Sequence, residues 1–219
     1  MSSALLQGSA ARPDGRVVAP YVTAWSAEVD PPHELVEVPG RGIAYADETV
    51  SDRDSNGVLW YRTSHCPGQG RPEFGRVHPM RQRRAMRRLL CQVCAGPADR
   101  TDDGVLWLLR DHRGDWPGWP DGMGVTEPPV CVPCLRFSVR VCPALRNGAV
   151  AVRAGRFAVD GVHGALHTGG PVPVFVGAVT VSLDNPAVRW VRAVSLAREL
   201  RDCTIVDLDE LAAGASCRT

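Results

Sequence analysis

Residues 90–94 read LCQVC and residues 128–134 read PPVCVPC, so the chain carries two C-x-x-C pairs, Cys91/Cys94 and Cys131/Cys134. Two thiolates separated by two residues point at one ion when the chain turns tightly between them, and two such pairs complete a tetrahedral Zn²⁺ site. The pairs predict a closed, structural zinc centre that encloses residues 95–130. Two redox-active pairs, or four unrelated buried thiols, are the alternatives.

The composition is that of a folded globular protein, with 219 residues of which 44% are hydrophobic and 22% are charged. All 25 basic residues are Arg, and Lys is absent. This excludes chemistry that depends on Lys, such as Schiff bases, pyridoxal phosphate anchoring and the P-loop lysine. The formal net charge of +1 gives no overall attraction to nucleic acid or to membranes.

The N-terminal residues do not have the pattern expected of a signal peptide. Residues 1–20 contain no apolar run of signal-peptide length, and no stretch approaches the roughly 18 apolar residues of a membrane helix. In a cytosolic chain, C-x-x-C pairs indicate metal ligands more than disulfides. We therefore expect a cytoplasmic protein without a membrane partner.

The pattern of apolar and turn residues predicts an α+β fold of short antiparallel strands around the zinc unit. Pro79 suits the first position of a helix that runs to about Leu90, after a loop over 64–77. A second helix begins near Cys131. A C-terminal amphipathic helix is expected over 186–202, whose apolar face consists of Val188, Val191, Val194, Leu196 and Leu200. Expected strands cover 21–27, 34–38, 43–45, 58–62, 105–109, 149–159, 172–183 and 204–208.

Composition divides the chain into four regions. Residues 1–20 are expected to form a flexible N-terminal lead, and residues 21–78 an acidic, β-rich region. Residues 79–146 contain the arginine-rich helix and the Cys₄ zinc unit. Residues 147–219 are expected to form a β-α-β C-terminal region.

The order of elements around the cysteines resembles the treble-clef zinc fingers over residues 88–142. A knuckle comes first, then a strand-rich segment, and then a cysteine pair that opens a helix. The phrases at 90–94 and 128–131, with Cys142-Pro143, are also similar to uncharacterised zinc-motif proteins of high-GC bacteria. Treble clefs serve many functions, so this resemblance implies a structural zinc and no particular activity.

The treble-clef family includes the HNH endonucleases, and Asp111-His112 lies between the cysteine pairs near the position of their Asp-His. The resemblance implies that His112 would activate water beside a catalytic metal. The chain departs from that family at two places: residues 126–129 (TEPP) replace an Asn, and Leu135 stands where a His follows the last cysteine. A loop histidine beside an acidic cluster is the other interpretation of His112.

Arginines are concentrated on both sides of the zinc unit. Residues 71–90 carry seven Arg against the single acid Glu73, and residues 136–156 carry five Arg and no acid. Arg suits bidentate contact with phosphate. The pattern predicts a nucleic-acid-binding surface made by Arg81, Arg84, Arg88, Arg136 and Arg140. A protein-binding surface, or a solvated face paired with acids of the same chain, are the alternatives.

The remaining cysteines and histidines form no complete active site in the sequence. Cys142 is either a spare ligand or a buried thiol, and His65, Cys66 and His78 are candidates for a second metal site. No G-x-S-x-G, G-x-G-x-x-G or H-E-x-x-H motif is present.

The sequence thus favours a non-catalytic, zinc-stabilised binding protein that contacts nucleic acid through arginines beside the zinc site. A protein-interaction or structural protein, specific to a phage or an operon, is the first alternative. A divergent HNH-type nuclease using His112 is the second.

Overall fold

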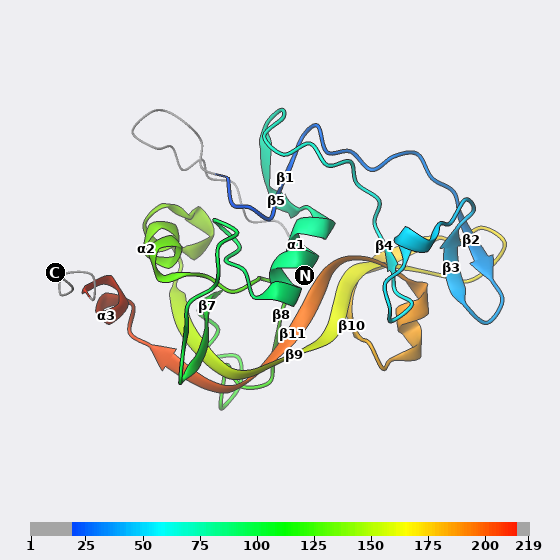
Figure 1. The fold of residues 1–219 in the computed structure, drawn as a ribbon. Coiled ribbons are helices and arrows are strands. Elements are labelled where there is room, and N and C mark those ends of the chain that lie inside the picture. The colour runs from blue at the N-terminus through cyan, green and yellow to red at the C-terminus, as the bar shows by residue number, and fades with distance from the viewer. Residues whose placement is uncertain (1–18, 214–219) are drawn as a thin grey trace.

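The computed structural model describes residues 19–213, which form a mixed α+β fold made mostly of strands (Figure 1). Two long antiparallel strands, β9 (Ala149–His167) and β11 (Val191–Val206), run the length of the molecule as a bent ribbon. Helix α1 (Pro79–Arg88) packs against β11 on the inner side of the bend. The ribbon and this helix are the frame on which the other elements are placed.

Shorter strands extend the ribbon into a seven-stranded sheet. On one side, β11 pairs in parallel with β4 (Leu59–Trp60) and antiparallel with β8 (Met123–Val125). On the other side, β9 pairs with β7 (Gly104–Arg110) near its start and with β10 (Phe175–Ser182) near its end. The strand β6 (Arg100–Thr101) forms a hairpin with β7. Regions far apart in the sequence therefore share one sheet.

The remaining elements are short. Two further antiparallel pairs are β1 (Thr23–Trp25) with β5 (Pro72–Val77), and β2 (Leu35–Val38) with β3 (Gly42–Tyr45). Helices α2 (Val132–Val141) and α3 (Leu208–Ala213) contact each other. In the described part of the chain, the short 3₁₀ helices are η1 (Val50–Asp52), η2 (Pro143–Leu145) and η3 (Pro186–Trp190). Within the described residues, no helix has the length and apolar character needed to cross a membrane.

Most of the expected elements are confirmed. The helices at Pro79 and after Cys131 form, and each expected strand coincides with an observed one. The segment 64–77 is not only a loop, because its end forms β5 and pairs with β1. The expected lead of residues 1–20 lies almost entirely outside the described residues.

The amphipathic helix expected over 186–202 is wrong, and with it the β-α-β order of the C-terminal region. Residues 186–190 form only the turn η3, and the chain then continues as strand β11. The helix-like spacing has a physical cause. The register shift after Ala193 leaves Val194 as an extra residue in β11, so Val191, Ala193 and Leu196 pack in one core cluster despite their uneven spacing.

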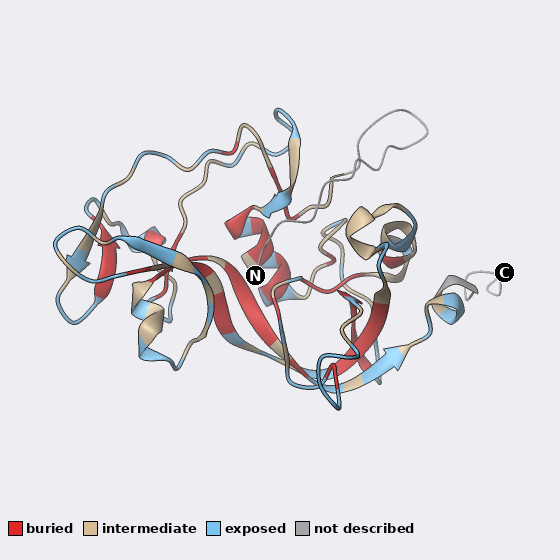
Figure 2. Cartoon of the chain, turned by 180° about the vertical axis from the view of Figure 1, so that it is seen from behind, coloured by how far each residue is buried: buried red, intermediate tan, exposed pale blue. Residues whose placement is uncertain are grey.

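Buried residues are concentrated in the long strands and in α1 (Figure 2), and they form clusters on both faces of the sheet. Strand β7 is buried along almost its whole length. Its residues Val105, Trp107 and Leu109 pack in one cluster, whereas Leu106 and Leu108 pack in the cluster on the opposite face. Since the second cluster includes cysteines of both pairs, this strand forms the floor beneath the candidate metal centre.

Helix α1 is fixed at its start by a buried ion pair. Arg81 donates to both carboxylate oxygens of Glu28 at 2.6 Å, and both side chains are buried. Arg81 also donates to the backbone carbonyl of Thr23 at 2.7 Å. The Glu28 carboxylate further accepts from the backbone N–H groups of Trp25 at 2.9 Å and Cys66 at 3.1 Å. One carboxylate therefore joins helix α1 to two otherwise separate segments of the chain.

The middle and the end of α1 are joined to β11 by side-chain hydrogen bonds. The amide of Gln82 accepts from Leu196 N–H and donates to the Leu196 carbonyl, both at 2.9 Å. It fills the gap between β4 and β8, so that it takes the place of a strand neighbour for Leu196. Arg198 donates from Nη2 to the Met86 carbonyl at 2.7 Å, near the end of the helix.

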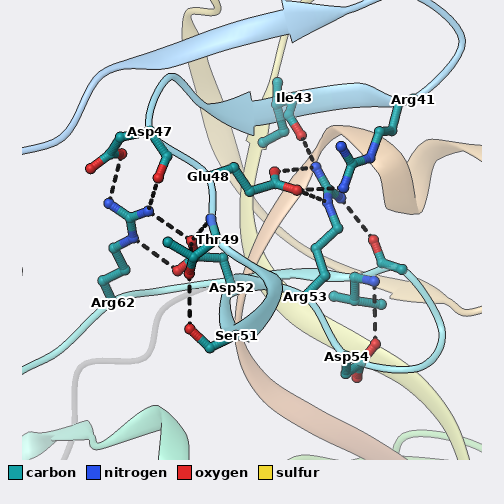
Figure 3. A network of polar contacts seen from close by, with 12 residues as sticks. Arg41, Ile43, Asp47, Glu48, Thr49, Ser51, Asp52, Arg53, Asp54 and Arg62 are labelled. Atoms are coloured by element: carbon teal, nitrogen blue, oxygen red, sulfur yellow. Dashed lines mark hydrogen bonds and ion pairs between the residues drawn. The ribbon is translucent and has the colours of Figure 1, made fainter.

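A separate polar network, drawn in Figure 3, holds the β2–β3 hairpin beside the sheet. Arg53 donates to Glu48 through Nε and Nη2 at 2.9 Å and to the Ile43 carbonyl at 2.6 Å. Arg62 donates to both oxygens of Asp52, at 2.9 and 2.7 Å. The bond from Arg62, against the opposing effect of burial, lowers the pKa of Asp52 to about 2. Arginines thus serve as internal connectors in this chain.

The Glu28–Arg81 pair predicts a large loss of stability on removal of the carboxylate charge. In Glu28→Gln, the Arg81 guanidinium stays buried without its partner, which lowers the free energy of unfolding by about 3–5 kcal/mol. Denaturant unfolding measures this change. The matched control is Glu73→Gln in the exposed pair with Arg76, where a change below about 1 kcal/mol is expected.

The same pair gives a pH dependence with a defined sign. Burial alone would raise the pKa of Glu28, but the bonds from Arg81 and Trp25 N–H outweigh burial and lower it from 4.5 to about 2. The stabilisation is therefore present above pH 4.5 and is lost as the pH falls from 4.5 towards 2. An acid-unfolding curve that is the same for wild type and Glu28→Gln would contradict this assignment.

Candidate metal centre

The four cysteines of the two C-x-x-C pairs converge in the structure. The Sγ atoms of Cys91, Cys94, Cys131 and Cys134 all lie within 4.8 Å of one another. The Sγ atoms of Cys94 and Cys131, which come from different pairs, are 3.8 Å apart. Each described cysteine is free of disulfide bonds. This cluster could hold one metal ion, and within residues 19–213 it is the only such group of three or more His, Cys, Asp or Glu residues.

The first pair lies on a tight knuckle directly after helix α1. The helix ends at Leu89, whose backbone is left-handed with φ 51°, so the chain reverses before Cys91. Cys91 N–H donates to the Gly96 carbonyl at 2.7 Å, and Ala95 N–H donates to the Cys91 carbonyl at 2.9 Å. Ala95 also has a positive φ of 61°. These turns close the loop tightly enough to bring both thiols to one point.

The second pair lies at the N-terminus of helix α2. Cys131 is the N-cap residue, and Cys134 follows in the first turn, so the two thiols share one face of the helix. Leu135 N–H donates to the Cys131 carbonyl at 2.9 Å. The positive end of the helix dipole favours the charged thiolate form of cysteines placed here. The position is therefore suited to anionic metal ligands.

Backbone hydrogen bonds join the two halves of the centre. Gln92 N–H in the knuckle donates to the Pro129 carbonyl at 2.9 Å, just ahead of the second pair. Val130 N–H donates to the Leu106 carbonyl of β7 at 2.9 Å, and Asp99 N–H donates to the Val130 carbonyl at 3.0 Å. Beneath them, Cys91 is fully buried against Leu106, Leu135 and their neighbours. The geometry is consequently set by the fold as well as by any ion.

The thiols differ in exposure and in acidity. Cys91 is buried, Cys131 and Cys134 are half-buried, and Cys94 is exposed. Burial raises the pKa of Cys131 to about 11, and burial with the neighbouring thiols raises the pKa of Cys134 further. Burial acts the same way on Cys94, but hydrogen bonds from Gly96 N–H and the other thiols outweigh it and lower its pKa. Four thiolates at this spacing require a cation, because their charges repel one another.

The other cysteine and histidine candidates lie outside the cluster. Cys142 caps the end of α2 and is half-buried. His78 is buried, with Nε2 3.1 Å from the Ser64 carbonyl, and its ring meets that of His65 edge-on at 5.5 Å. Cys66 contributes its backbone N–H to Glu28. Within the described residues, His65, Cys66 and His78 do not form a second metal-binding group.

His112 also stands apart from any metal-binding group in the part of the chain that the structure describes. Its Nδ1 lies 3.2 Å from Asp115 Oδ2, in a loop after β7, and its side chain is 41% exposed. Asp111 pairs with Arg113 at 2.5 Å. The hydrogen bonds from Arg113 lower the pKa of Asp111 to about 2. Both residues of the Asp111-His112 pair therefore have partners within their own loop.

The predicted arginine surface is only partly present. The prediction that Arg81 contributes to this surface is wrong, because its guanidinium is buried in the ion pair with Glu28. Arg136 is half-buried and donates to the Leu211 carbonyl at 2.5 Å, which joins α2 to α3. Arg84 is exposed and donates to the Tyr21 hydroxyl at 3.1 Å. The side chains of Arg88 and Arg140 are exposed and form no hydrogen bond or ion pair with residues 19–213.

The tryptophans of the insert are mostly structural. Trp107 and Trp119 are buried in the core, and only Trp116, at 39%, is appreciably exposed. Trp107 donates from Nε1 to the Glu127 carbonyl at 3.2 Å, which holds the segment before the second cysteine pair. No signal in the sequence separated these core residues from exposed ones, because apolar runs surround both.

Comparison of the chain with protein-family models, with curated proteins and with solved structures finds no match.

The cysteine cluster predicts that the purified protein contains one metal ion per chain. Because Cys134 is one of four ligands, Cys134→Ser is expected to weaken metal affinity by at least about 100-fold and to lower the melting temperature. Elemental analysis after dialysis against a chelator measures the first effect, and thermal unfolding the second.

Two controls separate ligands from other thiols. Cys142→Ser and Cys203→Ser change half-buried cysteines outside the cluster, so both variants are expected to keep the metal. Loss of the ion from Cys142→Ser would instead make Cys142 a ligand. Full metal content in Cys134→Ser would contradict the four-cysteine site.

Proposed function

We propose that this chain is a non-catalytic, zinc-stabilised binding protein that contacts the phosphate backbone of nucleic acid through arginines beside the cysteine cluster. The observation that carries the proposal is that the side chains of Arg88 and Arg140 are exposed, unpaired among the described residues and close in sequence to the cysteine pairs. Both are exposed without a carboxylate partner among the described residues, and both lie on helices that adjoin a cysteine pair. Arg84 extends this set along helix α1.

The choice of zinc rests on the donor set and its spacing. Four thiolates are typical of structural Zn²⁺ sites, where a Zn–S distance of about 2.3 Å places neighbouring sulfurs about 3.8 Å apart. The 3.8 Å between the Sγ atoms of Cys94 and Cys131 fits that spacing. A knuckle, the β6–β7 hairpin and helix α2 follow in the order of a treble clef, which supports a unit of that kind.

The state of the other exposed arginines strengthens the argument. In a chain without Lys, Arg fills every ordinary surface role, and many exposed Arg side chains form ion pairs with nearby acids. The pairs are Arg41–Glu48, Arg76–Glu73, Arg87–Asp54, Arg113–Asp111, Arg156–Asp202 and Arg201–Glu199. Other exposed arginines without an ion pair among the described residues are Arg71, Arg100, Arg110, Arg146 and Arg189. What singles out Arg84, Arg88 and Arg140 is their place on the two helices that adjoin the cysteine pairs. There they are available to phosphate, the anion that a guanidinium binds with two parallel hydrogen bonds.

A binding role is favoured over catalysis by the chemistry of the centre. A zinc ion with four protein thiolates has no open position for substrate or water, so its contribution is to the fold. The nuclease alternative requires a second metal held with His112, and the surroundings of His112 do not supply the ligands for one among residues 19–213. A protein partner for the same arginines is the remaining alternative.

The proposal predicts salt-dependent binding of duplex nucleic acid. Each phosphate neutralised by the protein releases condensed counterions, so the logarithm of affinity falls linearly with the logarithm of salt concentration. Replacing Arg88 and Arg140 with Ala should weaken binding and reduce that slope by about 0.9 for each phosphate that is no longer neutralised. Fluorescence anisotropy of a labelled duplex, titrated with the metal-loaded protein across salt, gives both quantities.

The matched control is the double variant Arg156→Ala/Arg201→Ala, which removes the same charge from exposed arginines that are paired with Asp202 and Glu199. Its affinity and slope should stay close to those of the wild type. An equal loss of affinity in both double variants would mean that binding depends only on the net charge of the protein. Absence of binding at low salt would refute the nucleic-acid function. Addition of Mg²⁺ at the end tests the nuclease alternative by cleavage of the duplex.

A further inference from the structure

Cys94 is the most accessible of the four clustered cysteines. It is exposed, whereas Cys131 and Cys134 are half-buried and Cys91 is buried. A glycine stands beside it: a Cβ atom at position 96 would lie 3.4 Å from Cys94 Sγ, so Gly96 leaves this side of the sulfur uncovered. Because oxidation of a cysteine follows its exposure and thiolate character, an oxidant in the solvent reaches the cluster first at Cys94.

A second thiol lies across the cluster from Cys94, at the start of helix α2. Cys131 Sγ is 3.8 Å from Cys94 Sγ. A disulfide S–S bond is about 2.05 Å long, so the two sulfurs need to approach each other by only about 1.8 Å to form one. Cys131 belongs to the other C-x-x-C pair, 37 positions along the chain. A bond between these sulfurs would therefore cross between the two halves of the centre.

Backbone hydrogen bonds keep the exposed thiol near the second pair whether or not an ion is bound. Gln92 N–H donates to the Pro129 carbonyl at 2.9 Å, and Asp99 N–H donates to the Val130 carbonyl at 3.0 Å. The two donors flank the exposed thiol in the sequence, and the two acceptors come directly before Cys131. The thiol across the cluster therefore stays within reach when the metal leaves.

The other two thiols are less free to turn towards Cys94. Cys91 is fully buried and packs in the core cluster that includes Leu106, so rotation of its side chain would disturb close-packed atoms. Cys134 lies inside the first turn of α2, where the helix restricts its rotamers. Cys131 is half-buried and lies just outside the helix, with an extended backbone. The structure thus favours a bond across the pairs over one within a pair.

We propose that Cys94 is a site of reversible oxidation and that Cys131 is its resolving thiol, so that a cross-pair disulfide takes the place of the metal. The Cys94 thiolate attacks hydrogen peroxide, which breaks the O–O bond and gives a sulfenic acid and a hydroxide ion. The Cys131 thiolate then attacks the Cys94 sulfur, forms the S–S bond and expels a second hydroxide ion. Two thiolates lose one electron each and one peroxide is reduced. The metal, left with two cysteine ligands, dissociates.

The disulfide preserves the arrangement that the metal supports. It joins the knuckle to the start of helix α2, which are the two segments that an ion held by the four cysteines would bridge. A cross-link between residues 37 positions apart restricts the unfolded chain, so the oxidised chain is expected to melt at a higher temperature than the reduced, metal-free chain. A disulfide within one C-x-x-C pair closes only a short loop and would stabilise the chain much less.

The test treats the full, zinc-loaded chain with hydrogen peroxide. A chromogenic chelator follows the release of zinc, and peptide mapping by mass spectrometry, after the free thiols are blocked, identifies the disulfide. One zinc ion is expected to be released for each Cys94–Cys131 disulfide, and a dithiol reductant with added zinc should restore the starting protein. Gly96→Val covers Cys94 without changing a ligand and should slow the release at least about threefold.

Two controls accompany this variant. Gly114→Val adds the same side chain to a glycine with open space around it, and should release zinc at the wild-type rate. Cys142→Ser removes a thiol outside the cluster and should form the same disulfide. If Gly96→Val does not fold or does not bind zinc, Gly96→Ala makes the same test with a smaller side chain.

Three results would each overturn the proposal: a zinc-loaded chain that keeps its metal in peroxide, a disulfide within either pair or to Cys134, and release from the Gly96 variants at the wild-type rate. The inference rests on the zinc centre of the proposed function, and the metal content measured before peroxide is added separates the two. A purified chain without metal would refute the zinc centre, and the disulfide that this chain forms would still decide between Cys131 and the other thiols.

Discussion

The position of helix α1 is the constraint on which the rest of the structure depends. The helix carries three buried polar connections: Arg81 to Glu28, Gln82 to Leu196, and the Met86 carbonyl to Arg198. The first joins the helix to the β1 segment, and the other two join it to the middle of β11. Leaving one of these groups without its partner would bury an unsatisfied charge or amide, which is costly in a dry interior. Together they fix where the helix ends.

The position of helix α1 in turn sets the position of the cysteine cluster. Only Leu89 and Leu90 separate the helix end from Cys91, and the knuckle is bonded through Gln92 to the segment before the second pair. A metal ion held by the four cysteines would therefore support the same arrangement as the buried polar contacts. The absence of Lys adds a second consequence, since Arg serves both as internal connector and as surface charge. Separating these two roles is what reduces the predicted binding surface to Arg84, Arg88 and Arg140.

Local patterns in the sequence were sufficient for the cysteine pairs, helix α1 and most strands, because C-x-x-C spacing, Pro79 and turn residues act over a few positions. Features that depend on distant partners were not predictable. Arg81 lies on the expected helix face, yet only the fold reveals that Glu28, 53 positions away, buries it. Strand β11 resembled a helix because the extra residue at Val194 alters its alternation.

Contact between nucleic acid and the arginines beside the cysteine cluster can be followed by nuclear magnetic resonance of the arginine Nε–H groups as a short duplex is added. The signals of Arg84, Arg88 and Arg140 are expected to shift with the duplex. Those of Arg81, Arg192 and Arg198, which are buried in the fold, should stay unchanged. Signals that do not move at all, or that move only for arginines already paired with acids, would contradict this contact.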